Sequence, residues 1–308
     1  MPPFDRENGD GMSSKPTTSA AIAEFIGAEL IGGDIPLTGV CAFDNIRPDC
    51  LLFVERVTPA VQLDLAQLPR NLVIGGSDME LALSGPHIAV PNPRLAFVRA
   101  ARRFFCIESP HSIHPTAVID PAAHLGTNVG VGAFAVIGPD VVVGDNTAIG
   151  NHVVLAGRTR IGRDCRLKSG CVIGEDGFGF VRDAGGQPLA TPHFGGVTIG
   201  DFVSIGALST IERGIFDDTV LEDHVKVDDL VQIGHNSVVA RGACIAAGAI
   251  LCGGARVGAA AWIAPNSNLL ERKRVGARAL IGLGSTVLGD VPDDGVFMGN
   301  PARKLRDA

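Results

Sequence analysis

Three stretches of the chain carry residues that could do chemistry. One is rich in glycine and phenylalanine, Asp176–Phe180, in which Phe178 and Phe180 are candidate ligand contacts. A second is the charged stretch that begins at Arg213, which is also a candidate for substrate binding. The third holds His235 beside an asparagine. An imidazole titrates near neutral pH, so a histidine in a depression can accept or release a proton. If the fold brings the three stretches together, they predict a cleft that contains a titratable group.

A repeat with a period of six surrounds these stretches. An aliphatic residue recurs every six positions over Ile113–Ile173, Ile199–Ile211 and Leu221–Val287. The residue two positions earlier is small or β-branched in nearly every repeat, so both side chains point to one face of a short strand. This pattern predicts a mainly β fold, a parallel β-helix of hexapeptide repeats in which three hexads close one triangular coil and successive coils stack about 4.8 Å apart.

The register of the repeat predicts where the chemical residues lie. The interruptions at 175–197 and 213–219 both follow a hexad of the same face, and so does the corner at His235. The same edge carries Gly253 one coil higher, and Glu271 with Arg272 two coils higher. We therefore expect both insertions and His235 to meet along one edge of the prism.

The N-terminal third lacks the repeat and reads as a separate domain. Amphipathic helices are expected over Ser19–Leu30 and 93–105, with short apolar strands at 51–54, 72–74 and 88–90 between them. The expected organisation is a disordered segment at 1–16, a small α/β domain at 17–110, the β-helix at 111–298 and a short C-terminal tail at 299–308.

Composition and charge exclude several classes of function. Lys and Arg number 26 against 33 Asp and Glu, a net charge of -7 without a basic stripe, which disfavours a nucleic-acid partner. No apolar run reaches the roughly 18 residues of a membrane span, and the N-terminus lacks the apolar core of a signal peptide. We expect a cytoplasmic protein whose Cys165 and Cys171 are reduced core residues. A metal site is not expected, because His235 has no neighbouring histidine on its edge.

The order of three motifs resembles the UDP-3-O-acylglucosamine N-acyltransferase family of the lipid A pathway. The motifs are IGEDGFGF, ERGIFDDT and VKVDDLVQIGHN, and the likeness extends to PNPRLAFVRAARRFF in the N-terminal domain. The resemblance implies a left-handed β-helix that forms a homotrimer, with active sites between adjacent prisms. It also implies a nucleotide-linked amino sugar as acceptor and a 3-hydroxyacyl donor carried by the phosphopantetheine of acyl carrier protein, with no permanently bound cofactor.

The resemblance also implies roles for individual residues. His235 matches the family's catalytic base, which takes a proton from the amine as the amine attacks a thioester. A backbone N–H at the Gly253 corner is a candidate donor to the resulting oxyanion. Asp228 matches an acidic position that orients the imidazole or binds the amino sugar; an ordinary solvated corner carboxylate is an equally open interpretation.

Three departures from the family pattern concern substrate recognition. Asp229 stands where the family has asparagine, which would add a negative charge near the site, and Arg272 stands where a second histidine is usual. An arginine cannot act as a base but can hold a phosphate or carboxylate. In the aromatic segment that stacks uracil in the family, Phe53 remains, whereas Arg56 and Pro59 replace the other two residues. These departures leave the nucleotide base open.

The C-terminal sequence widens the choice of donor. Gly299–Lys304 resembles the ending of coenzyme A-dependent hexapeptide acetyltransferases. The expected function is N-acylation of a nucleotide-linked amino sugar from acyl carrier protein. Two alternatives remain open: an acetyl-coenzyme A-dependent N-acetyltransferase acting on another nucleotide amino sugar, and a binding solenoid without catalysis.

Overall fold

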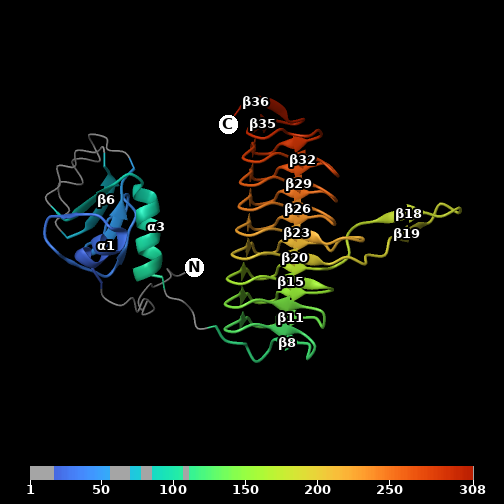
Figure 1. Ribbon diagram of the computed structural model, residues 1–308, viewed down its shortest axis with the longest axis horizontal. Helices are drawn as coiled ribbons and strands as arrows, with labels where there is room; N and C mark the ends of the chain where they lie inside the picture. The colour runs from blue at the N-terminus through green and yellow to red at the C-terminus, as the bar shows by residue number, and fades with distance from the viewer. Residues whose placement is uncertain (1–16, 56–69, 78–84, 107–110, 308) are drawn as a thin grey trace, which may run out of the picture. The chain divides into compact units, whose positions relative to one another are not determined.

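The computed structural model describes residues 17–55, 70–77, 85–106 and 111–307 (Figure 1). The chain divides into two compact units, Met1–Ser109 and Pro110–Ala308, so the division falls in the proline-containing link between the N-terminal third and the repeat. The segment 1–16, for which disorder is predicted, lies outside the described residues. Within the described part of the chain, no helix is long and apolar enough to cross a bilayer.

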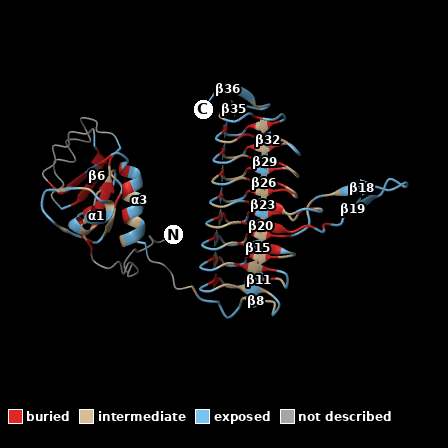
Figure 2. Ribbon diagram, in the orientation of Figure 1, coloured by how far each residue is buried: buried red, intermediate tan, exposed pale blue. Residues whose placement is uncertain are grey.

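The N-terminal unit is a small α/β domain built on a five-stranded sheet of order β2-β7-β6-β5-β4. The last four strands run parallel, and β2 pairs antiparallel with β7. The central strand β6 is fully buried, whereas the outer side of helix α3 is exposed (Figure 2). The strands are β1 (Thr17–Thr18), β2 (Leu30–Ile31), β3 (Pro36–Leu37), β4 (Gly39–Val40), β5 (Cys50–Phe53), β6 (Leu72–Gly76) and β7 (His87–Val90), with β1 paired to β3.

The two helices among the described residues of this unit each begin at a capping side chain. Helix α1 (Ser19–Ile26) is capped by Thr18, and α3 (Pro93–Phe104) by Asn92. The prediction that the first helix continues to Leu30 is wrong. Gly27 adopts a left-handed conformation with φ 75° and donates its N–H to the last turn, which ends the helix.

The second unit is a triangular prism of stacked coils, each with one strand on each of three faces, here named A, B and C in chain order. Face A contains β10 (Gly130–Val131), β13 (Ala148–Ile149), β16 (Arg166–Leu167), β21 (Ser204–Ile205), β24 (Lys226–Val227), β27 (Cys244–Ile245), β30 (Trp262–Ile263), β33 (Leu280–Ile281), β35 (Gly295–Met298) and β36 (Arg303–Asp307). Face B contains β8 (Val118–Ile119), β11 (Val136–Ile137), β14 (Val154–Leu155), β17 (Val172–Ile173), β22 (Thr210–Ile211), β25 (Gln232–Ile233), β28 (Ile250–Leu251), β31 (Asn268–Leu269) and β34 (Thr286–Val287). Face C contains β9 (His124–Leu125), β12 (Val142–Val143), β15 (Thr159–Ile161), β20 (Val197–Ile199), β23 (Thr219–Leu221), β26 (Val238–Val239), β29 (Arg256–Val257) and β32 (Arg274–Val275).

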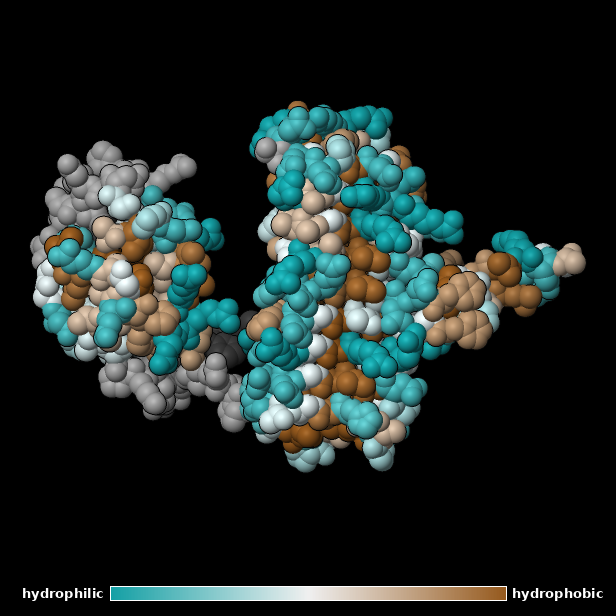
Figure 3. All heavy atoms as spheres, in the orientation of Figure 1, coloured by the Kyte–Doolittle hydropathy of each residue, from teal (hydrophilic) through white to brown (hydrophobic). Residues whose placement is uncertain are grey.

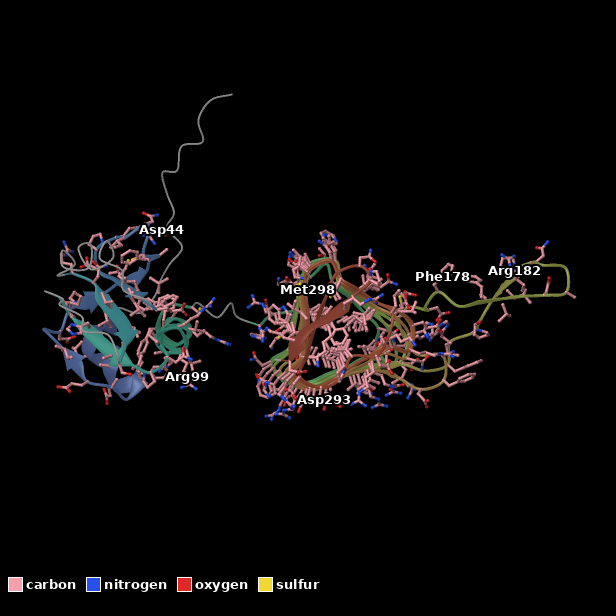
Figure 4. The ribbon with its side chains drawn as sticks, turned by 90° about the horizontal axis from the view of Figure 1, so that it is seen from above. Asp44, Arg99, Phe178, Arg182, Asp293 and Met298 are labelled. Atoms are coloured by element: carbon pink, nitrogen blue, oxygen red, sulfur yellow. The ribbon has the colours of Figure 1, made fainter. Side chains whose placement is uncertain are left out.

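The repeat predicted this register correctly. On face B, Leu155, Ile173, Ile211 and Ile233 pair in succession although the second and third are separated by a long insertion. These aliphatic side chains are buried and fill the interior of the triangle, which is visible from above in Figure 4. The strands thus pair in the plane of each face while their inward side chains stack along the prism.

The small inward positions are buried as well, and their polar members are satisfied locally. The Thr147 hydroxyl donates to the Gly162 carbonyl (2.9 Å), and the Ser209 hydroxyl donates to the Asp228 carbonyl (2.8 Å). Cys165 and Cys171 lie here as free thiols. Burial raises the pKa of the Cys165 thiol to about 11 and that of Cys171 to about 12, so both stay protonated at neutral pH.

Two features interrupt or end the prism. Strands β18 (Phe180–Arg182) and β19 (Pro188–Ala190) form an antiparallel hairpin, here called the arm, which projects from the prism (Figure 1). Part of the short C-terminal tail expected at 299–308 forms strand β36, which folds back and pairs antiparallel with β35. The Ala302 N–H also donates to the Thr286 carbonyl (2.8 Å), which ties this last strand to the top coil.

The tight corner at Gly206 provides a test of the register. A Cβ at this position would collide with the backbone of Asp228 and Asp229 in the coil above. We expect Gly206→Ala to lower the free energy of unfolding by about 1–3 kcal/mol, as overpacking does. The measurement is the midpoint of urea unfolding followed by far-UV circular dichroism.

Gly289→Ala is the matched control, because a Cβ at Gly289 meets no atom within 4 Å. Its urea midpoint should equal that of the unmodified protein. Equal midpoints for both variants would contradict the stacking at the Gly206 corner.

Candidate active site

The edge between faces B and C, here called the B–C edge, brings the predicted stretches together. Strands β17, β22 and β25 are neighbours on face B, and they lead into the first insertion, the second insertion and His235 respectively. The first insertion reaches the imidazole, since a Cβ on Gly177 would lie 3.0 Å from His235 Cδ2 and 2.6 Å from Glu212 Oε2. The predicted convergence is therefore confirmed.

The side chain of Asn236 fixes the tautomer of His235. The Ile215 N–H donates to Asn236 Oδ1 (3.0 Å), and Asn236 Nδ2 donates to the Asp217 carbonyl (3.0 Å), so the orientation of the amide is set by both contacts. His235 Nδ1 lies 3.1 Å from the same Oδ1, which can only accept. Nδ1 therefore carries the hydrogen, and Nε2 of the neutral ring holds the free lone pair.

The lone pair of His235 lies next to a glycine corner one coil above. A Cβ on Gly253 would be 2.5 Å from His235 Nε2, so only glycine leaves room for the ring in this position. Among the hydrogen bonds of the described residues, none uses the Gly253 N–H as donor, whereas the N–H groups of corners such as Ala207 donate to a carboxylate. A proton acceptor and an unpaired backbone donor thus lie side by side.

Glu212 supplies a negative charge at the same corner, and the sequence analysis missed it. The His235 N–H donates to Glu212 Oε2 (3.0 Å), and Gln232 Nε2 donates to Oε1 (3.2 Å). The carboxylate would offset the positive charge that His235 gains on taking a proton. Its position directly before the second insertion, one coil below His235, was the available signal.

Arg213 connects the two insertions. Its guanidinium donates through Nε to the carboxylate of Asp176 and forms an ion pair with it. This contact holds the glycine- and phenylalanine-rich loop against the charged loop. Within the described residues Arg213 therefore acts first as a structural link of the site.

Phe178 and Phe180 lie where the arm leaves the prism, not against the imidazole. Their rings meet edge to face at 5.0 Å, and Phe178 is 85% exposed. With Arg182 and Pro188 they line a depression of about 440 Å³. Figure 4 shows Phe178 at the base of the arm and Arg182 farther out, and Figure 3 shows hydrophobic residues along the arm.

The two acidic candidates lie on another edge of the prism. Asp228 and Asp229 follow β24 of face A, so they belong to the edge between faces A and B. Asp229 pairs with Lys168 (2.8 Å) and accepts from the Ala207 N–H; the Lys168 ammonium is the main cause of the lowered pKa of this carboxyl. Within one chain Asn236, and not Asp228, holds Nδ1 of His235. The other two interpretations of Asp228, contact with the amino sugar and an ordinary solvated carboxylate, stay open.

Two further candidates, Arg272 and Phe53, lie in different units of the chain. Arg272 follows β31 on the B–C edge, two coils above His235, and pairs with Glu271 (3.4 Å) while its stem covers Gly254. Phe53 belongs to the N-terminal unit and packs on Phe97 with ring centroids 4.8 Å apart. Arg56 and Pro59 lie outside the described residues.

A second histidine reaches the site from the first insertion, which corrects the expectation that His235 has no histidine neighbour. The rings of His193 and His235 are 5.6 Å apart at an interplanar angle of 76°. Spacing could not show this, because His193 lies outside the hexad register. In the described ranges, no cluster of three or more His, Cys, Asp or Glu side chains is arranged to hold a metal ion.

Comparisons with known structures and family models agree on the fold. The model of the bacterial transferase hexapeptide (six repeats) matches residues 122–157 and 140–175. A UDP-N-acetylglucosamine acyltransferase structure from Bacteroides fragilis is 24% identical with a TM-score of 0.59, and covers 64% of this chain and 74% of that one. Another from Campylobacter jejuni is 23% identical with a TM-score of 0.57, covering 64% and 75%. The predicted β-helix of hexapeptide repeats is confirmed.

Full-length relatives carry the resemblance seen in the motifs. A protein of Delftia acidovorans named UDP-3-O-acylglucosamine N-acyltransferase is 40% identical over 285 residues, covering 90% of this chain and 84% of the relative. A protein of the same name from Herminiimonas arsenicoxydans is 31% identical and covers 90% and 86%. Likeness of this extent includes both units, and the chain belongs to the UDP-3-O-acylglucosamine N-acyltransferase family.

Proposed function

We propose that this protein transfers a 3-hydroxyacyl group from acyl carrier protein to the amine of a nucleotide-linked amino sugar, the N-acylation step of lipid A synthesis. The observation that carries the proposal is the state of His235. Its Nδ1–H is held by Asn236, and its free Nε2 lies beside Gly253 at the corner where both insertions meet. The names of the full-length relatives support the same reaction.

The proposed reaction begins with attack of the amine nitrogen on the thioester carbonyl. As the N–C bond forms, His235 Nε2 takes a proton from the nitrogen and the carbonyl oxygen becomes an oxyanion. The Gly253 N–H donates to that oxyanion. When the intermediate collapses, the C–S bond breaks and the proton passes from His235 to the departing thiolate, so the enzyme returns to its starting state.

The remaining candidates concern binding. Phe178 and Phe180 offer an apolar surface to the substrate, and Arg272 a cation to a phosphate. Phe53 is proposed to contact the nucleotide base, and Asp228 and Asp229 to face the amino sugar across the boundary of neighbouring prisms in a homotrimer. A cytoplasmic location and a donor on phosphopantetheine follow from the family and stay predictions.

Replacing the general base His235 tests the proposed reaction. His235→Ala should lower kcat/KM by roughly a hundredfold to ten-thousandfold, the usual contribution of a general base. The rate is measured as transfer of labelled acyl chain to the amino sugar. His224→Ala is the matched control, because His224 is exposed on another edge, where its ring stacks on Phe202.

An unchanged rate in His235→Ala would leave a binding solenoid without catalysis at this histidine as the better interpretation. Equal losses in both histidine variants would show a general effect of the substitution on the protein.

Filling the space beside Nε2 gives an independent test. Gly253→Ala places a Cβ 2.5 Å from His235 Nε2, and the ring must turn away from the donor corner. We expect kcat to fall by at least about tenfold, the scale of losing one oriented catalytic contact, with the urea midpoint nearly unchanged because the ring can move. Wild-type kcat in this variant would contradict the assigned corner.

The donor decides between the two acylation reactions. Purified protein should turn over with a 3-hydroxyacyl chain on acyl carrier protein and UDP-linked 3-O-acylglucosamine, and not with acetyl-coenzyme A. Product is followed by mass spectrometry as the gain of one acyl amide. Turnover with acetyl-coenzyme A alone would replace the proposed donor by coenzyme A.

A further inference from the structure

His193 is a buried imidazole with one nitrogen left unpaired. The side chain is 4% exposed, and Nδ1 lies 2.9 Å from the Thr191 carbonyl. A carbonyl oxygen can only accept, so Nδ1 carries the hydrogen and Nε2 of the neutral ring carries a lone pair. Nε2 is buried and, within the described residues, has no hydrogen-bond partner. A buried polar atom without a partner lowers the stability of the folded protein, so its presence calls for an explanation.

The backbone around His193 fixes the position of the ring. The Thr191 N–H donates to the Gly179 carbonyl (2.8 Å), and the Phe194 N–H donates to the Ile215 carbonyl (2.7 Å). The ring is thus held from both insertions at once. The ring also lies close to Gly179, since a Cβ there would be in ordinary contact with His193 Cε1 at 3.6 Å.

The ring held in this way packs on His235. Their centroids are 5.6 Å apart and their planes meet at 76°, so the edge of one imidazole faces the ring of the other. His193 Nε2 is too buried to meet a substrate directly. Any effect of His193 on the reaction must therefore pass through His235.

We propose that His193 is a positioning residue: a neutral imidazole that holds His235 in place and stabilises the positive charge that His235 acquires during acyl transfer. A lone pair and the π-electrons of a neighbouring ring both attract a cation, and the attraction is strong in a desolvated setting. This inference rests on the proposed function, since it requires His235 to take a proton in the reaction.

Glu212 also offsets the charge on His235, but its carboxylate contacts the backbone N–H of that residue and not the imidazole. The two arginines of this corner are engaged in ion pairs. These pairs are Arg213 with Asp176 and Arg272 with Glu271. His193 is the neighbour whose ring contacts the imidazole itself.

The test compares His193→Phe with His193→Gln. Phenylalanine keeps a ring but removes both nitrogens, and glutamine can place an oxygen near the position of Nε2. In His193→Phe we expect kcat to fall by about tenfold and the acid limb of the pH profile to move to lower pH by roughly half to one unit, because the nitrogen lone pair is lost although a ring is kept. The direction follows because His235 loses stabilisation of its protonated form and becomes a weaker base. His193→Gln should stay within about threefold of the unmodified enzyme, since an acceptor is retained.

A second measurement needs no turnover. Diethyl pyrocarbonate modifies only unprotonated imidazole, so the pH dependence of its reaction with the His235 peptide, followed by mass spectrometry, reports the protonation of His235 in each variant. We expect the same downward shift in His193→Phe, and none in His152→Phe, whose histidine stacks on Phe134 at another edge. His193→Leu serves as a second variant that lacks the nitrogens.

The outcomes separate this inference from the proposed function. An unshifted His235 titration in His193→Phe and His193→Leu, or equal losses in the phenylalanine and glutamine variants, would reduce His193 to a packing residue. An upward shift would show that His193 itself carries a charge and would overturn the inference. Wild-type turnover in His235→Ala would instead contradict the proposed function while leaving the titration result valid.

Discussion

The rest of the structure depends on one constraint, that every coil of the prism returns in register after three strands. An extra residue inside a strand would break pairing with the coils above and below, so additional chain can leave only at a corner. Face C shows that the rule holds across both insertions, because Ile161, Ile199 and Leu221 pair in succession. The insertions therefore leave the pairing of the prism unchanged and add two loops along one edge.

Asn236 connects the corner of the prism and the second insertion to the imidazole of His235. Its amide accepts from Ile215 and donates to Asp217, both in the second insertion, and the same oxygen lies at His235 Nδ1. The residue adopts a left-handed conformation, φ 58°, which asparagine tolerates better than most side chains and which turns the corner. One side chain thus makes the corner, holds the loop and sets the tautomer of the base.

The hexad repeat allowed the positions within the prism to be predicted from the sequence. Contacts that depend on the path of a loop could not be predicted in this way. Inward positions, faces and the shared edge of His235, Gly253 and Arg272 follow from counting hexads, because strand pairing permits one register. The pairing of Asp229 with Lys168 could be missed since 61 residues separate them, and His193 approaches His235 through an insertion that has no period. The end of the first helix at Gly27 and the return of β36 are likewise decided by local turns that lie outside the repeat.

The site is shaped by missing side chains as much as by those present. Gly177 and Gly253 flank the His235 ring, and a Cβ at either position would occupy space that the ring or its neighbours need. Small corners expose backbone N–H groups, and at Gly253 that donor has no partner among the described residues and lies beside Nε2. When His235 takes a proton, its positive charge lies between two groups. The Glu212 carboxylate is below it and the neutral His193 imidazole is at its side. Because the nearby cation Arg213 is already paired with Asp176, no uncompensated positive charge among the described residues of this corner opposes that step.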